Sequence, residues 1–293
     1  MAQITILNDM VSQDFAASLD IQKSWGIQVL DLRQNIFGKN LAGLTIDEAK
    51  AAAEQIAERD MSVYCLSSGI FLNDIELGRE AFANRYDAEI EHIIQLAEVL
   101  KPKVVRLLSA RSSKRDAYLD SVEHMEANHP WVIPMYREAV DRIHSAGLQV
   151  TIENEAKKCI WSKPNEIIGF FRELNRPDKV SFTFDVQNIW FEGTFPTMDV
   201  YRELRPLMGY YHLKGGQTGE SGDKLVWQSA LDDASWPVAE LTKQVLADKA
   251  TEVICLNPSH GEVKPGYDYN NLDKRNYDYV KNIIDSMNED GSS

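Results

Sequence analysis

The chain has 293 residues, of which 44% are hydrophobic, and its formal net charge is −14. A chain of this length and apolar content can bury one large core, and we expect a single domain over residues 1–293. A negative charge of this size disfavours binding to nucleic acids and to anionic lipid surfaces.

The cysteines and the N-terminal residues indicate the cellular compartment in which we expect the protein. Cys65, Cys159 and Cys255 lie far apart and form no CxxC pair, so neither a disulfide framework nor a structural zinc knuckle is predicted. The chain reaches the acidic Asp9 without a basic segment followed by an apolar one, so no signal peptide is expected. No apolar run approaches the roughly 20 residues that cross a bilayer. We therefore expect a cytoplasmic protein.

Short apolar runs alternate with amphipathic stretches along the whole chain. The runs have the length and composition of β-strands, and the stretches between them have the periodicity of helices. Strands are predicted over residues 3–8, 26–32, 62–67, 103–109, 148–153, 180–185, 210–214 and 252–257.

Helix boundaries are marked by capping signals. Thr45 and Glu48 have the spacing of a capping box at the start of an alanine-rich helix. Apolar residues recur at three- and four-residue spacing over 87–101, as on one face of a helix. Gly147 has the position of a C-cap, and Ser235 is predicted to be the N-cap of a later helix.

Strands that alternate with helices predict a parallel sheet. Eight such units in a chain of this length predict an α/β fold of the single (β/α)8 TIM barrel type. An open doubly wound sheet is the alternative. The sequence contains neither GxGxxG after the first strand nor GxxxxGK[ST], so the usual nucleotide-binding signatures are absent.

The inward face of the later strands is polar and ends in side chains that can bind metals. In the run 148–153, Thr151 and Glu153 share the face opposite the apolar residues, and Thr183 and Asp185 do so in the next strand. Parallel strands that are buried on both sides are normally almost entirely apolar. A polar face that ends in a carboxylate at the C-terminal tip therefore indicates a site.

The last two strands continue this pattern. His212 and Asn257 occupy the same face, at the ends of the strands 210–214 and 252–257. Because neighbouring strands lie about 4.8 Å apart, Glu153, Asp185, His212 and Asn257 are expected to converge at the C-terminal mouth of the barrel. This oxygen-rich set suits Mn²⁺ or Mg²⁺ best, with Co²⁺ and Zn²⁺ as alternatives.

Four short motifs resemble those of the xylose-isomerase-like barrel superfamily, the sugar phosphate isomerase/epimerase group. Each motif follows a predicted strand, from the fifth to the eighth, and the first and third are the most specific. They are Ile152-Glu153-Asn154, Phe184-Asp185-Val186-Gln187-Asn188, Tyr211-His212-Leu213-Lys214 and Cys255-Leu256-Asn257-Pro258.

The chain departs from the family pattern at two positions. Asn188 stands where a histidine is common, and Asn257 stands where a fourth, glutamate ligand is common. An asparagine can bind a metal through its carbonyl oxygen, but it cannot accept a proton. Epimerisation that needs a base on each face of the substrate is therefore weakened, unless Glu262 or His260 takes the place of the missing base.

The resemblance implies a metal-dependent isomerase or epimerase that acts on a small carbohydrate through an enediolate. Glu153 would be the base, and Lys214 would donate to the developing oxyanion. The expected substrate contacts are Asn188, Arg106, Glu155, Trp190 and His260, and no role in the chemistry is expected of His92, His124, His129 and His144.

Several alternatives remain at this stage. One is a metal-dependent dehydratase of a related polyol ketone, and another is a catalytically silent barrel that binds a sugar. An abasic-site endonuclease, which shares the superfamily, needs histidines near strand ends where this chain has none, and its charge is unsuited to DNA. A homo-oligomer is compatible with the sequence, and substrate and phosphorylation state are left open.

Overall fold

The computed structural model describes residues 2–219, 222–258 and 262–290. Within them, eight parallel strands form one sheet in the order β1-β10-β7-β6-β5-β4-β3-β2. The bounds of the strands are β1 Gln3–Ile6, β2 Val29–Leu32, β3 Ser62–Ser67, β4 Val104–Leu108, β5 Gln149–Glu153, β6 Val180–Asp185, β7 Met208–Leu213 and β10 Val253–Leu256.

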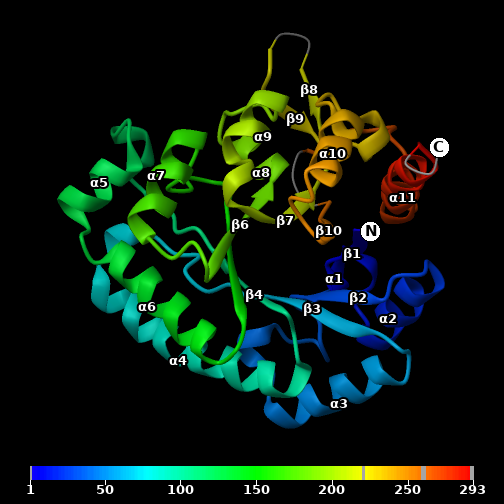
Figure 1. Cartoon of the computed structure of the whole chain (residues 1–293), viewed down its shortest axis with the longest axis horizontal. Helices are drawn as coiled ribbons and strands as arrows, with labels where there is room; N and C mark the ends of the chain where they lie inside the picture. Colours follow the sequence, from blue (N-terminus) through cyan, green and yellow to red (C-terminus); the bar gives the residue numbers. More distant parts are fainter. Residues whose placement is uncertain (1, 220–221, 259–261, 291–293) are drawn as a thin grey trace.

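A parallel bridge between Leu7 and Asp31 joins the two ends of this sheet, so that the strands curve into a nearly closed barrel. The predicted TIM barrel is therefore confirmed, and each of its eight strands overlaps a predicted run. Helices surround the strands, and the C-terminal helix α11 lies beside β1, near the N-terminus (Figure 1).

Most helices cover the outside of the barrel, and a few lie in the loops that connect strands to these helices (Figure 1). The outer helices are α2 Phe15–Ser24, α3 Ile46–Ala57, α4 Arg79–Leu100, α6 Val132–Ser145, α7 Pro164–Leu174, α9 Met198–Leu204, α10 Val238–Ala247 and α11 Leu272–Asp290. The loop helices are α1 Asn8–Val11, α5 Ser121–Asn128 and α8 Val186–Phe191, and a hairpin of β8 Gln217–Thr218 and β9 Leu225–Trp227 follows β7.

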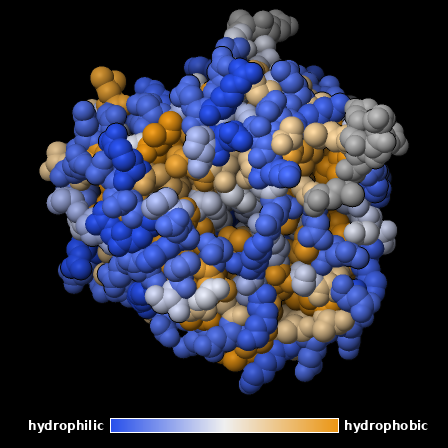
Figure 2. Space-filling view, in the orientation of Figure 1, coloured by the Kyte–Doolittle hydropathy of each residue, from blue (hydrophilic) through white to orange (hydrophobic). Residues whose placement is uncertain are grey.

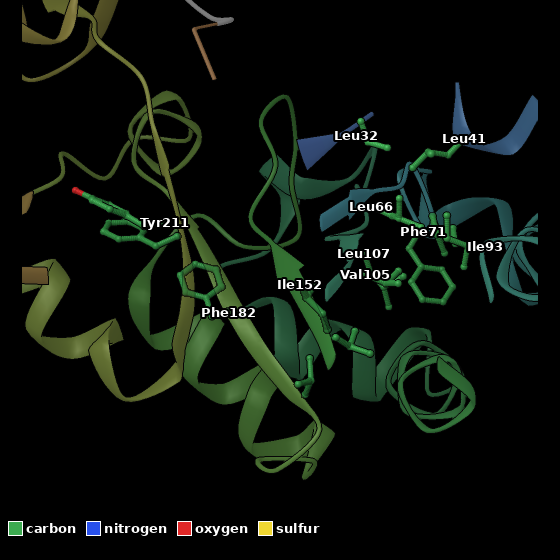
Figure 3. Close-up of a cluster of buried hydrophobic side chains, with 14 of the residues drawn as sticks. Leu32, Leu41, Leu66, Phe71, Ile93, Val105, Leu107, Ile152, Phe182 and Tyr211 are labelled. Atoms are coloured by element: carbon green, nitrogen blue, oxygen red, sulfur yellow. The ribbon is translucent and has the colours of Figure 1, made fainter. Parts of the chain in front are cut away.

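The main hydrophobic core lies between the strands and the outer helices. Alternate residues of each strand point outward into this layer and meet the apolar faces of the helices. Figure 3 shows part of the core, in which Leu66, Val105, Leu107 and Ile152 come from strands and Phe71 and Ile93 come from the loop and helix that cover them.

A second, smaller apolar cluster fills the inside of the barrel. Its members come from β2, β3, β4, β7 and β10 and from the residue that follows β1, so they meet across the barrel axis. This cluster comprises Leu7, Val29, Tyr64, Cys65, Val104, Tyr210, Val253 and Cys255. The polar residues of the inward face lie beyond it, toward the strand C-termini, where the site is formed.

The helix signals are partly confirmed. The Thr45 side chain accepts from the backbone N–H of Glu48, whose carboxylate bonds back to Thr45, so the capping box is present. Gly147 follows the C-cap of α6 with a φ of +86°. The prediction for Ser235 is wrong, because α10 begins at Val238 and the Ser235 hydroxyl instead donates to Gln217 at 2.8 Å. A tertiary contact has replaced the local cap.

The surface is mainly hydrophilic, as Figure 2 shows for one face, where hydrophobic residues form small, separate patches. Large apolar side chains with high exposure include Leu119, Val263 and Leu77. No helix in the described part of the chain has the length and apolarity needed to cross a membrane.

Gly215, two residues after the end of β7, gives a test of the packing that holds the mouth together. A Cβ at this position would lie 2.0 Å from the carbonyl oxygen of Ser229 and 2.7 Å from that of Ala230. We expect Gly215→Ala to lower the free energy of unfolding by about 1–3 kcal/mol, measured by urea denaturation, because backbone must move to relieve the overlap. Gly69→Ala is the control, since nothing lies within 4 Å of its added Cβ. Equal stability of the two variants would contradict this account.

Candidate active site

Three side chains with metal-binding groups meet at the C-terminal ends of three neighbouring strands. Glu153 ends β5, Asp185 ends β6 and His212 lies near the end of β7. Each is at most 1% exposed, and their ligand atoms all lie within 4.8 Å of one another. The Nδ1 atom of His212 lies 3.1 Å from Oε1 of Glu153 and 3.9 Å from Oδ2 of Asp185. The convergence expected from strand alternation is present.

Local bonds hold the two carboxylates in place. The Asn154 side chain donates to the carbonyl of Asp185 and accepts from its N–H, both at 2.9 Å, and so joins the end of β5 to that of β6. Asp185 is also the N-cap of α8, because its Oδ1 accepts from the N–H groups of Gln187 and Asn188. Its Oδ2 is left to face the cluster.

Arg106, from β4, forms a buried ion pair with Glu153. Its Nη1 donates to Oε2 of Glu153 at 2.6 Å, and its Nη2 donates to the carbonyl of Ser68 at 2.9 Å. The Ser68 hydroxyl returns a bond to the Arg106 carbonyl. Burial opposes ionisation of Glu153, but the charges of His212 and Arg106 outweigh it and bring the pKa of this carboxyl well below its usual range. Glu153 is therefore ionised.

Lys214 plays the corresponding role for Asp185. It is 1% exposed, and its Nζ lies 2.8 Å from Oδ2 of Asp185 and 3.0 Å from Oδ1 of Asn188. Burial raises the pKa of Asp185 to about 6, although Lys214 lowers it. Lys214 is thus part of the site and not a surface lysine.

Asp31 is a further member of this cluster that sequence reasoning missed. It is fully buried at the end of β2, and its Oδ2 accepts from the Tyr210 hydroxyl at 2.7 Å and lies 3.9 Å from Nε2 of His212. Burial raises its pKa. The sequence contains a signal for Asp31, because this residue is a carboxylate on the inward face of its strand, as Glu153 is. It was missed because β2 lies far in sequence from the strands that carry the other motifs.

A cavity of about 370 Å³ opens beside the cluster, toward the loops after β2 and β3 and the helix α4. Arg106, Glu153, Glu155, Lys214 and Asn257 form its polar floor. Its outer walls come from Arg33, Gln34, Leu41, Ile70, Arg85 and His92, among others. No role in the chemistry was expected of His92, which lies in α4 and whose Nε2 is engaged by the carbonyl of Leu44 at 2.8 Å.

Asn257 is buried, and its Oδ1 has no hydrogen-bond partner in the described part of the chain. A buried amide oxygen without a partner is costly, and a cation or a ligand hydroxyl would satisfy it. It lines the same cavity as Glu153.

The other expected substrate contacts are placed differently. Asn188 lies beneath the cavity, where it bonds to Lys214 and to the carbonyl of Asn154. Glu155 lines the cavity, and Arg111 holds its carboxylate at 3.2 Å. Trp190 is buried against Phe195 and is absent from the cavity wall, because α8 turns its ring into the core.

Of the two residues considered as a replacement base, only Glu262 belongs to the part of the chain that the structure describes. Glu262 is exposed, and its backbone pairs with that of Trp227, so its side chain is not part of the cavity wall. His260 lies outside the described residues. Among the described residues, Glu262 therefore does not replace the base that Asn257 lacks.

Solved structures with the same architecture are distant in sequence. A xylose isomerase-like TIM barrel protein from Mycobacterium smegmatis, crystallised with magnesium, has a TM-score of 0.70 and 14% identity, covering 97% of this chain and 96% of that one. A probable 3-DHS dehydratase, AsbF, from Bacillus anthracis has a TM-score of 0.69 and 13% identity, covering 95% and 97%. The 3-keto-D-glucoside 4-epimerase YcjR from E. coli has a TM-score of 0.69 and 12% identity, covering 97% and 99%.

No curated protein sequence matches this chain. At these identities the likeness to solved structures establishes the fold and leaves the reaction open. The family model described as "Xylose isomerase-like TIM barrel" matches residues 19–268, which is most of the chain. The protein belongs to the xylose isomerase-like TIM barrel family.

Proposed function

We propose that this protein is a divalent-metal-dependent isomerase or epimerase of a sugar or a related polyol ketone, with Glu153 as its base. The observation that carries the proposal is the buried group of Glu153, Asp185 and His212 at the floor of a cavity of about 370 Å³. Structural neighbours that include a 3-keto-D-glucoside 4-epimerase and a probable 3-DHS dehydratase support the reaction class.

The donor set fits a divalent cation. Ligand atoms about 2.1 Å from an octahedral ion lie about 3 Å apart, close to the 3.1 Å between Glu153 and His212. The unpartnered Oδ1 of Asn257 would supply a fourth donor, an amide oxygen. We propose Mn²⁺ or Mg²⁺ as the physiological ion, with Co²⁺ and Zn²⁺ able to substitute. When bound, the ion would polarise the carbonyl of the substrate and stabilise the negative charge that develops on it.

The residues of the chain would then move the proton. The ionised carboxylate of Glu153 takes it from the carbon next to the carbonyl, the electrons of the C–H bond move toward the carbonyl oxygen, and an enediolate results. Lys214, held by Asp185 and Asn188, donates to an oxygen of the substrate as its charge grows. Arg106 keeps Glu153 oriented between removal and return of the proton.

Asn257 limits what this apparatus can do. Because an amide cannot exchange a proton, one base on one face favours aldose–ketose isomerisation, in which Glu153 returns the proton to the adjacent carbon. Dehydration of a hydroxyketone is the second candidate, because this reaction also begins with proton removal by a single base. The fold that this chain shares with the probable dehydratase AsbF supports it. Both assign the same roles to Glu153 and Lys214.

Metal content tests the placement of the site. We expect Glu153→Ala and His212→Ala each to lose most of the ion that wild-type protein retains after dialysis against Mn²⁺, because each removes a ligand from a buried set. Elemental analysis of the dialysed proteins measures this, and Glu155→Ala is the matched control. Wild-type metal content in both ligand variants would show that the ion lies elsewhere.

Hydrogen exchange tests the base. In D₂O with Mn²⁺, a panel of ketoses and inososes should include a compound that gains deuterium next to its carbonyl, observed by NMR. Lys214→Met should retain the metal but slow exchange by about 10²-fold or more, as expected on loss of an oxyanion donor. Absence of exchange from every compound, with metal bound, would instead support a catalytically silent barrel.

The ion pair of Arg106 and Glu153 can be tested by stability alone. We expect Arg106→Met to lower the free energy of unfolding of metal-free protein by about 3–5 kcal/mol, because Glu153 loses its buried cation. The double variant Arg106→Met/Glu153→Met should recover most of this loss in urea denaturation. Arg172→Met, at an exposed position, should change stability by less than about 0.5 kcal/mol. If the losses of stability caused by Arg106→Met and by Glu153→Met simply add in the double variant, the two residues are not a coupled pair.

A further inference from the structure

A second group of metal-binding side chains lies at the rim of the mouth, outside the barrel. Glu76 comes from the short helix Ile75–Leu77 in the loop after β3, and His124 and His129 come from α5 and its C-terminal end in the loop after β4. Their ligand atoms lie within 4.8 Å of one another, and the group shares no residue with the cluster around Glu153. We propose that Glu76, His124 and His129 form a zinc site that ties these two loops together.

The spacing of the donor atoms suits a tetrahedral ion. Nε2 of His124 lies 3.1 Å from Oε1 of Glu76, and Nε2 of His129 lies 3.2 Å from Oε2. Ligand atoms about 2.1 Å from a tetrahedral Zn²⁺ lie about 3.4 Å apart, so small side-chain shifts would admit the ion. Two imidazoles and one carboxylate are a ligand set that Zn²⁺ accepts, with water in the fourth position.

The two imidazole rings are held in this orientation by their surroundings. The ring of His124 stacks on Tyr118 with centroids 3.9 Å apart and an interplanar angle of 9°. The ring of His129 stands edge-on to Trp131 at 6.2 Å. Both histidine side chains are largely buried, with 12% and 11% exposed. Nε2 of His129 is buried without a well-formed hydrogen bond. Rings fixed in this way lose little freedom when an ion binds.

The electrostatics of the group favour a cation. Burial opposes ionisation of Glu76, but bonds from Lys114, His124 and Ser112 lower its pKa to about 2, so it is a carboxylate at neutral pH. The ammonium of Lys114 lies 2.8 Å from Oε2 and is 64% exposed. The ammonium group of Lys114 thus already pairs with the carboxylate of Glu76, and its exposed side chain can turn away into solvent. Zinc would replace Lys114 on the carboxylate and bind the two Nε2 atoms in their unprotonated form.

A metal here would stabilise the shape of the mouth. Asp74, two residues before Glu76, forms a β-bridge with Arg111, and Arg111 holds Glu155 at the cavity. Ser112, next to Arg111, donates to Glu76 at 2.8 Å. Fixing Glu76 to His124 and His129 would therefore limit the motion of a loop that positions a cavity residue. This role is structural, and it does not depend on the proposed reaction.

The test uses the full chain, freed of metal with a chelator and dialysed against Zn²⁺. We expect the double variant His124→Ala/His129→Ala to bind one equivalent less than wild type by elemental analysis, and Glu153→Ala/His212→Ala to keep that equivalent. Zinc should raise the Tm of wild type and of the second variant, but not of the first. His144→Ala, on α6, is the matched histidine control and should behave as wild type.

Lys114→Ala separates a zinc site from a hydrogen-bonded group and does not alter the ligands. If zinc replaces the ammonium, this variant should bind the rim ion at least tenfold more tightly in calorimetric titration. Equal zinc content in wild type and His124→Ala/His129→Ala, or no gain in affinity in Lys114→Ala, would overturn the proposal. Should the double variant fail to fold, the titration of Lys114→Ala decides the question. Loss of zinc only from Glu153→Ala/His212→Ala would support the barrel site and reject the rim site.

Discussion

Burial of several charges in one small space is the constraint on which the mouth of this barrel depends. Asp31, Glu153 and Asp185 are three carboxyl groups inside a protein interior, where an unpaired charge costs several kcal/mol. Arg106 compensates Glu153, Lys214 compensates Asp185, and the Tyr210 hydroxyl bonds to Asp31. The two residues of each pair come from different strands. The interactions that compensate the buried charges therefore also hold the strand ends in register.

The same pairing leaves one oxygen of each of two carboxylates facing the cluster. Oε2 of Glu153 binds Arg106 while Oε1 faces His212, and Oδ1 of Asp185 caps α8 while Oδ2 faces Lys214. The cluster therefore keeps its geometry through internal cations.

The cavity lies at the mouth of the barrel, so its residues contact the surrounding loops. The cavity lies on the side of β2, β3 and β4, and the loops after β2 and β3 and the helix α4 form much of its rim. Ser68 braces Arg106 from the loop after β3, and Arg111 braces Glu155 from the loop after β4. The group of Glu76, His124 and His129 joins the two loops at a distance from the proposed base. Stability of the rim is therefore a means of controlling how precisely the cavity residues are placed.

The alternation of polar and apolar residues in the strands was enough to predict the barrel, and also that Glu153, Asp185 and His212 share its inside, because successive side chains of a strand must point to opposite faces. Contacts between distant segments were not predictable in this way. Asp31 accepts a hydrogen bond from Tyr210, which lies 179 positions later in the sequence. The ring of Trp190 packs in the core, and Ser235 bonds to Gln217 in place of capping a helix. Those outcomes depend on how the strands are staggered around the barrel and on the paths of the loops, which no local periodicity records. Sequence alone thus determined which faces are polar, and only the tertiary structure decided which polar groups are partners.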